Sequence, residues 1–177
     1  YNDSSIILNK CAIGNNTKNN ATFYTHDLTT GQSGFHKIST ESKDSINLNE
    51  LKEKKDVNDL KKYNDLLNHV RNVEIIRLDH YMEEKNIVDV NILKIDTQGH
   101  EPEVLEGLGG KLSHVGIIIT ELMFYDYYER SLSFSDIEKY LIPAGFKLYD
   151  ISHISKNPMN GRTDWVDVIY INDQIIK

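Results

Sequence analysis

The hydrophobic positions of this chain fall into short runs, and the most informative run ends in a carboxylate. Val90–Ile95 (VNILKI) is largely apolar and stops at Asp96, after which the turn Thr97–His100 leads to Pro102. Such runs are typical of buried parallel strands, and proline suits the first positions of a helix. In open α/β sheets, ligands bind just beyond the carboxyl ends of the strands. We therefore expect the functional site at the Asp96 turn.

A second run repeats this arrangement. Val115–Thr120 (VGIIIT) is apolar and ends at Glu121, and the glycines within 107–110 end the helix that begins near Pro102. Strand, helix and strand form a βαβ unit, which is right-handed almost without exception. Further strands are expected at the remaining apolar or alternating runs, which are Ser4–Ile13, Ala21–His26, Val73–Leu78, Phe146–Ile151 and Trp165–Ile171.

The polar segments complete the pattern. Leu28–Asp44 is rich in Thr, Ser and Gly and predicts an exposed loop. Apolar residues recur at helical spacing among the charges of Asn47–Val70, so we expect a helical insertion at residues 45–70 that covers a sheet edge or forms a lid. Ser133 or Ser135 caps a later helix. The last two runs alternate, which favours a closing antiparallel hairpin, and the expected fold is α/β with a mixed sheet.

Composition bounds the class of protein. The 177 residues suit one domain, residues 1–177, with its own core. The net charge of −7 argues against a nucleic-acid surface, and no apolar run approaches the roughly 18 residues of a membrane span. The single cysteine, Cys11, excludes an internal disulfide and a cysteine-based zinc site, and a reducing, cytoplasmic location is expected.

Asp96 and Glu121 are the first candidates for chemistry, because adjacent parallel strands bring both carboxylates to one edge of the sheet. The two carboxylates could bind one divalent cation together, or one of them could act as the general base that deprotonates a hydroxyl. The alternative is that each carboxylate only caps the amino end of the following helix, where the helix dipole favours a negative charge. His100 in the turn is placed to relay protons. HEPEV (100–104) lacks the second histidine of HExxH and the other histidines show no ligand spacing, so no metal ligand is assigned.

Leu93–Gly107 (LKIDTQGHEPEVLEG) resembles the signature segment of the FkbM family of methyltransferases, which is roughly LKIDVEGxExxVLxG. The upstream stretches VEIIRLDHYMEEKNIVDVNILKID and IILNKCAIGNN resemble the family's preceding strands, so the resemblance covers nearly the whole chain. The family is similar to class I S-adenosylmethionine-dependent enzymes. The resemblance implies a Rossmann-like sheet that is mostly parallel and ends in a closing antiparallel hairpin. It also implies S-adenosyl-L-methionine as the cofactor and methylation of a hydroxyl on a sugar or polyketide-type acceptor.

Two features depart from the family pattern. Gln98 stands where the family usually has glutamate, and no glycine-rich strand, turn and helix that grips the cofactor is found. By family topology the sheet then lacks two central strands, between Ser5–Ile13 and Val90–Ile95, which leaves edges that proteins avoid. We expect this chain to be the carboxyl-terminal part of a longer methyltransferase domain, rather than a fold in which other packing closes the gap.

The resemblance implies a role for each part of the site. The residues expected to face the methionine end of the cofactor are Asp96, Thr97 and Gln98, and those near its adenine are Asn9, Cys11 and Ala12. Independently of the resemblance, Glu121 and the aromatic Tyr125 after it are expected to contact the acceptor; the alternative for Tyr125 is a packing role. The catalytic base is expected to be Asp96 or His100.

Two other hypotheses remain open. A non-catalytic domain of the same ancestry would bind a carbohydrate or a protein partner, which Gln98 and the missing glycine-rich loop favour. A different Rossmann-like enzyme would use Asp96 and Glu121 as a metal-binding carboxylate pair. The presence of coding sequence upstream of Tyr1 for a glycine-rich strand and turn would favour the enzyme over the non-catalytic binding domain, and its absence would favour the binding domain.

Overall fold

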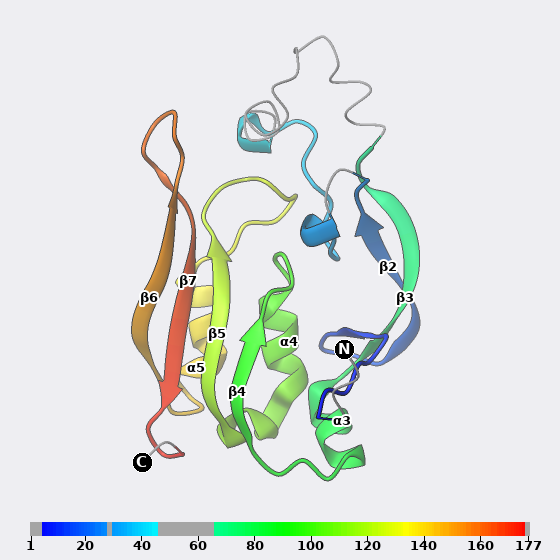
Figure 1. Ribbon diagram of the computed structural model, residues 1–177, viewed down its shortest axis with the longest axis vertical. Coiled ribbons are helices and arrows are strands. Elements are labelled where there is room, and N and C mark those ends of the chain that lie inside the picture. The colour runs from blue at the N-terminus through cyan, green and yellow to red at the C-terminus, as the bar shows by residue number, and fades with distance from the viewer. Residues whose placement is uncertain (1–4, 28–29, 46–65, 176–177) are drawn as a thin grey trace.

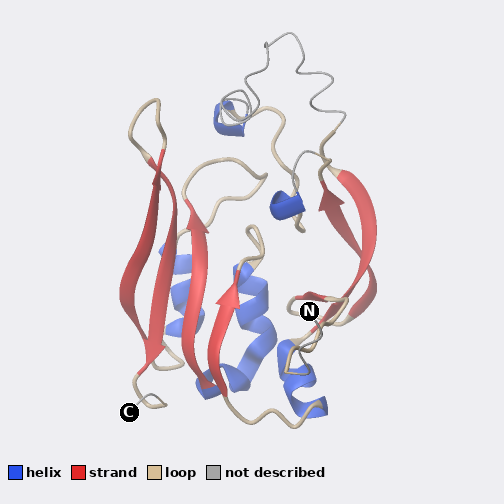
Figure 2. Cartoon of the chain, in the orientation of Figure 1, coloured by secondary structure: helices blue, strands red, loops and turns tan. Residues whose placement is uncertain are grey.

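In the part of the chain that the structure describes, the strands form two separate sheets (Figures 1 and 2). The computed structural model describes residues 5–27, 30–45 and 66–175. The first sheet has the order β1-β3-β2, with bounds Ala12–Ile13 (β1), Lys18–Thr25 (β2) and His69–Ile76 (β3). The second has the order β4-β5-β7-β6, with bounds Val90–Ile95 (β4), Val115–Met123 (β5), Phe146–Lys156 (β6) and Thr163–Asn172 (β7).

Short helices connect these strands. Their bounds are Leu78–Glu84 (α3), Glu101–Leu108 (α4) and Phe134–Leu141 (α5), with 3-10 turns at Thr30–Gln32 (η1) and Gly109–His114 (η3). The expected cap of α5 is confirmed at Ser133, whose backbone N–H donates to Oδ2 of Asp136 at 2.8 Å. No helix in the described part of the chain is long and apolar enough to cross a membrane.

The expectation of one mostly parallel sheet is wrong. Among the described strands, β1/β3 and β4/β5 pair in parallel, whereas β2/β3, β5/β7 and β6/β7 pair antiparallel. Each parallel pair needs a crossover, and α4 supplies the one between β4 and β5. The closing antiparallel hairpin of β6 and β7 is confirmed. The other antiparallel pairs are β5 with β7 and β2 with β3. The sheets are therefore mixed.

Two expected elements differ in extent. The strand expected over Ser4–Ile13 is reduced to Ala12–Ile13, because Ile7 and Leu8 are 76% and 89% exposed and have no neighbouring strand. The helical insertion expected over residues 45–70 lies mainly outside the described residues. Its last described part, from residue 66, is a turn that leads into β3, so that end of the helix is wrong.

The core lies on one face of the second sheet. Helices α4 and α5 pack behind this sheet (Figure 1). Ile118 and Leu122 of β5 and Val168 of β7 are fully buried toward them. Alternate residues of a strand point to opposite faces, so Glu121 lies on the face away from α4 and α5, where it is half-buried.

The first sheet meets the second at α4. A Cβ atom on Gly107 would overlap the backbone carbonyl oxygen of Gly14, so only glycine permits this approach. Beside it, Nδ2 of Asn15 donates to Oε2 of Glu106 at 3.0 Å. Within the described residues β4 pairs only with β5 and β1 only with β3, so the interruption of the sheet expected between these two strands is observed.

One loop segment also joins the two sheets through its backbone. Gly34 forms a bridge with Tyr24 of β2, and Ile38 forms a bridge with Tyr128 in the segment after β5. Ile38 is 1% exposed, so the segment is anchored in a core of its own with the tyrosines that follow β5. The segment lies next to the Asp96 turn, since a Cβ atom on Gly34 would be 3.3 Å from Cβ of Gln98.

Candidate active site

Asp96 directly follows the carboxyl end of β4, and both of its carboxylate oxygens accept hydrogen bonds. Nζ of Lys94 donates to Oδ2 at 2.7 Å, and Nε2 of Gln98 donates to Oδ1 at 2.8 Å. Burial raises the pKa of the Asp96 carboxyl, but the two hydrogen bonds and the lysine charge outweigh it, so the pKa lies below its ordinary value. Asp96 is therefore a fixed anion and a weak base.

Glu101 shapes the turn that follows. Its carboxylate is 2% exposed, and Oε1 accepts hydrogen bonds from the Thr97 backbone N–H at 2.9 Å, the Thr97 hydroxyl at 3.0 Å and the Gly99 N–H at 3.3 Å. Gln98 and Gly99 adopt positive φ values of 55° and 94°. The buried carboxylate holds this tight conformation, which presents the Gln98 side chain to Asp96. Sequence analysis missed this role, although an acidic residue beside Pro102 was visible as a helix start.

The pKa of Glu121 lies near neutral pH. The register pairs Ile95 with Thr120, so Asp96 and Glu121 follow on adjacent strands as expected. Burial, and then the negative charges of Asp96, Asp167 and Glu101, raise the pKa of Glu121 to about 7, although Lys94 opposes them. A carboxyl with this pKa exchanges a proton at working pH, which Asp96 does not.

Tyr128 extends the network beyond the two strands. Its hydroxyl donates to Oε1 of Gln98 at 2.7 Å and lies 3.0 Å from the Gln32 carbonyl oxygen. The ring is 2% exposed. Gln98 thus connects Asp96 to a buried tyrosine. Tyr125, expected to contact the acceptor, is 6% exposed and packs against Tyr127 and Trp165, so the structure shows a packing role for its ring.

Of the residues expected near adenine, Ala12 lies in β1 of the first sheet, and Asn9 and Cys11 lie just before it. Nδ2 of Asn9 donates to the Tyr81 hydroxyl of α3 at 3.0 Å, and Ala12 pairs with Ile75 of β3. Cys11 is a free, half-buried thiol whose pKa is raised by burial and by Glu74. None of the hydrogen bonds of Asn9 or Cys11 in the described structure reaches Asp96. Their contact with the cofactor stays a prediction.

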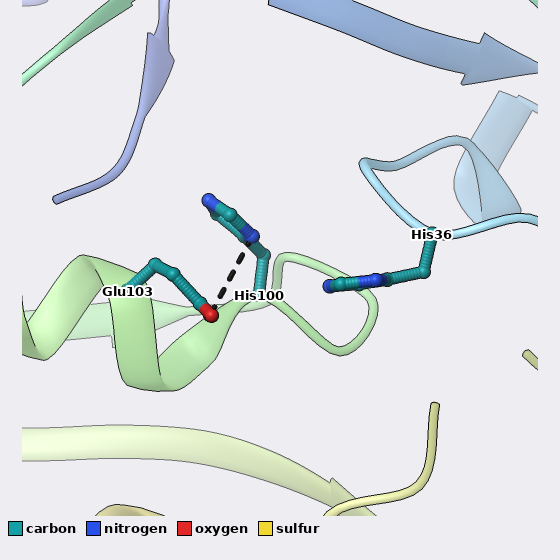
Figure 3. A group of neighbouring side chains, drawn as sticks. All are labelled: His36, His100 and Glu103. Carbon is teal, nitrogen blue, oxygen red and sulfur yellow. Dashed lines mark ion pairs between the residues drawn. The ribbon is translucent and has the colours of Figure 1, made fainter. Parts of the chain in front are cut away.

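His100 belongs to a different group of side chains. Its ring centroid lies 4.3 Å from that of Phe35 and 5.7 Å from that of His36. Its Nδ1 lies 3.5 Å from Oε2 of Glu103, with which it forms an ion pair when the ring is protonated (Figure 3). The side chain is 12% exposed. Burial lowers the pKa of His100 to about 4, against the attraction of Glu103, so the ring is neutral near pH 7.

Arg130 completes this second group. Its Nη1 donates to Oε1 of Glu103 at 2.7 Å and lies 3.3 Å from Nε2 of His36. The first sheet reaches it as well, because a Cβ atom on Gly14 would lie 3.1 Å from Nε2 of His100. No sequence spacing links His36, His100 and Arg130, since the segments that carry them meet only in the folded chain.

Comparison with known proteins decides the family. The model of the FkbM methyltransferase domain matches residues 1–148, which is most of the chain and includes every candidate residue named above. The chain belongs to the FkbM methyltransferase family. The match covers both sheets up to the start of β6, so both the Asp96 turn and the His100 group lie inside the FkbM domain. No curated protein and no solved structure matches the chain significantly.

Proposed function

We propose that this FkbM domain transfers the methyl group of S-adenosyl-L-methionine to a hydroxyl of a sugar or polyketide-type acceptor. The observation that supports this most directly is the pairing of two unlike carboxyls at the carboxyl ends of β4 and β5. Asp96 is held ionised by Lys94 and Gln98, whereas the pKa of Glu121 is about 7. Two carboxyls with separated pKa values are typical of sites that hold one charge fixed and move one proton.

The residues fit a positively charged cofactor. Asp96, Glu121 and Asp167 gather negative charge at neighbouring strands, and this charge adds to the effect of burial, which is the largest cause of the raised pKa of Glu121. When bound, S-adenosyl-L-methionine supplies an electrophilic methyl group on a sulfonium. Asp96 and Gln98 would hold its cationic methionine end, and Thr97 is fixed beside them by Glu101. Asn9, Cys11 and Ala12 remain the proposed adenine side.

Glu121 is the group that we assign to the acceptor proton. Methylation of a hydroxyl forms a carbon–oxygen bond, breaks the carbon–sulfur bond and releases the hydroxyl proton, which a carboxylate with a pKa of about 7 accepts readily. Asp96 is less suited because both its oxygens are engaged. His100 is the alternative base, weakened by the burial that lowers its pKa to about 4. Much of the rate then comes from positioning the two reactants.

The remaining parts of the proposal concern setting and partners. The acceptor is a small molecule or carbohydrate rather than a nucleic acid, in keeping with the net charge of −7. A cytoplasmic setting suits the free thiol of Cys11. A non-catalytic role as a carbohydrate- or protein-binding domain is the second candidate, since the neutral Gln98 occupies the Asp96 carboxylate.

Two measurements test this function. Titration of S-adenosylhomocysteine into the folded protein in a calorimeter is expected to show binding, and no binding by folded protein would overturn the proposal. With an active acceptor, Glu121→Gln is expected to lower kcat by about 100-fold or more. Complete loss of activity in His100→Gln, together with a wild-type rate in Glu121→Gln, would show that His100 and not Glu121 is the base that accepts the proton.

A further inference from the structure

We propose that His36, His100 and Glu103 form a binding site for a divalent metal ion such as Zn²⁺. In the metal-free protein the Arg130 side chain occupies part of this site. The site is separate from the Asp96 and Glu121 pair and does not depend on methyl transfer. One ligand atom from each of the three residues lies within 4.8 Å of the others (Figure 3). Two imidazoles and one carboxylate are the ligand set of many zinc sites.

The distance between two of the ligand atoms already suits a metal. Nδ1 of His100 and Oε2 of Glu103 are 3.5 Å apart. Two ligands about 2.0–2.1 Å from a tetrahedral zinc ion stand about 3.4 Å from each other. Both atoms are buried, and neither makes a hydrogen bond. The two atoms form only an ion pair with each other. Buried polar atoms without a hydrogen bond are rare because they cost free energy, and a shared cation would satisfy both.

His36 supplies the third ligand from the loop segment that joins the sheets. The ring packs closely against Gly99, because a Cβ atom on that glycine would lie 3.3 Å from Cδ2 of His36. Nε2 of His36 then faces Nη1 of Arg130 at 3.3 Å.

Arg130 takes the place of a cation in the metal-free form. Its Nη1 contacts Oε1 of Glu103 at 2.7 Å and approaches His36 at the same time, so the guanidinium charge lies between two of the ligands. The side chain is 30% exposed, which leaves it free to turn toward solvent. A metal ion must displace this charge, and removal of the charge should therefore strengthen metal binding.

The metal would connect two parts of the chain that meet only by packing. His36 belongs to the segment between Gly34 and Ile38, whereas His100 and Glu103 belong to the start of α4. Three protein ligands leave a fourth position open, as in catalytic zinc sites. A metal-bound His100 has its Nδ1 lone pair in the bond and is then not available as a base.

The test is equilibrium binding of Zn²⁺ to protein first treated with chelator, measured by calorimetry at pH 7.5. The wild type is expected to bind one ion per chain at this site. His36→Ala and Glu103→Gln are each expected to weaken binding by at least about tenfold, while Arg130→Gln is expected to strengthen it. The visible spectrum of bound Co²⁺ should report a tetrahedral site in the wild type and lose that form in His36→Ala.

The controls separate this site from chance binding. His114→Ala removes an exposed histidine elsewhere, and Cys11→Ser removes the only thiol; both are expected to bind as the wild type does. Circular dichroism identifies any variant that fails to fold, and Arg130→Gln tests the site without removing a ligand. Unchanged binding in His36→Ala, loss of binding in Cys11→Ser, or weaker binding in folded Arg130→Gln would overturn the proposal. Failure of the protein to bind S-adenosylhomocysteine would contradict the proposed methyltransferase function but not the proposed metal site.

Discussion

The Tyr128 hydroxyl lies 2.7 Å from Oε1 of Gln98, and Nε2 of the same amide lies 2.8 Å from Asp96. The side chain of Gln98 therefore accepts at one end and donates at the other. An amide can do both, whereas the carboxylate of a glutamate has no N–H to give to Asp96. The glutamine that departs from the family pattern is thus matched to its two neighbours.

Gln98→Glu is expected to destabilise the fold by about 1–3 kcal/mol, since it places a second carboxylate against Asp96 and removes a hydrogen bond. The cost should fall in high salt, which screens like charges. Tyr128→Phe is the matched control, because it removes one hydrogen bond to Gln98 without adding charge and should cost about 1 kcal/mol at any salt concentration. Urea unfolding at low and high salt measures both. Equal salt dependence in the two variants would contradict this account.

Glu121 is expected to make the protein less stable as pH rises from about 4.3 to about 7. Its pKa is raised to about 7 in the fold by burial and by Asp96, Asp167 and Glu101, with Lys94 opposing, so the folded state binds more protons than the unfolded state in this range. The loss is complete above the folded pKa.

Glu121→Gln should therefore raise the Tm at pH 8 by about 2–4 °C for each kcal/mol recovered, with little gain at pH 4. Thermal unfolding across this range checks the sign. Glu129→Gln, a change at a carboxyl outside this group, is the control and should show no comparable trend. A gain that is the same at pH 4 and pH 8 would rule out the titration of Glu121 as its cause.

Gly107→Ala is expected to destabilise the protein strongly, by about 2–4 kcal/mol, even though alanine favours helices. The added methyl group would overlap the Gly14 carbonyl oxygen and force the first sheet away from α4. Gly110→Ala is the matched control, because nothing lies within 4 Å of a Cβ atom at that position. Urea midpoints compare the two. A small effect of Gly107→Ala would mean that β1 does not rest on α4.

Glu101→Ala is expected to loosen the Asp96 turn and to cost about 2–4 kcal/mol, because three hydrogen bonds lose their buried acceptor. Amide hydrogen exchange at Thr97 and Gly99 should become faster. Glu106→Ala, in the same helix, removes one exposed hydrogen bond to Asn15 and should stay within about 0.5 kcal/mol of the wild type. Unchanged exchange at Gly99 in Glu101→Ala would show that the turn is held by other contacts.

The local parts of the fold were predictable from the sequence. Val90–Ile95 has the bounds of β4, and Pro102 lies in the first turn of α4 as expected. The hairpin of β6 and β7 followed from alternation. In each of these segments neighbouring residues along the chain determine the element, through the side-chain period, a cap or a breaker.

The parts that depend on long-range packing were not predictable. The apolar run Ile6–Leu8 has the composition of a strand but finds no partner in the described structure, so it stays exposed. The site shows the same division. Asp96 and Glu121 were found because parallel strands align their ends, whereas His36 and Arg130 reach His100 only through the folded loop and the segment after β5.

The link between the sheets has a consequence for how the molecule opens. Among the described residues no strand of one sheet pairs with a strand of the other, and the backbone bridges at Gly34 and Ile38 join them instead. Cooperative opening follows continuous hydrogen-bonded units. The amides of β2 and β3 are thus expected to exchange with solvent as one group and those of β5 and β7 as another, and the segment between Gly34 and Ile38 determines how closely the two groups respond to each other.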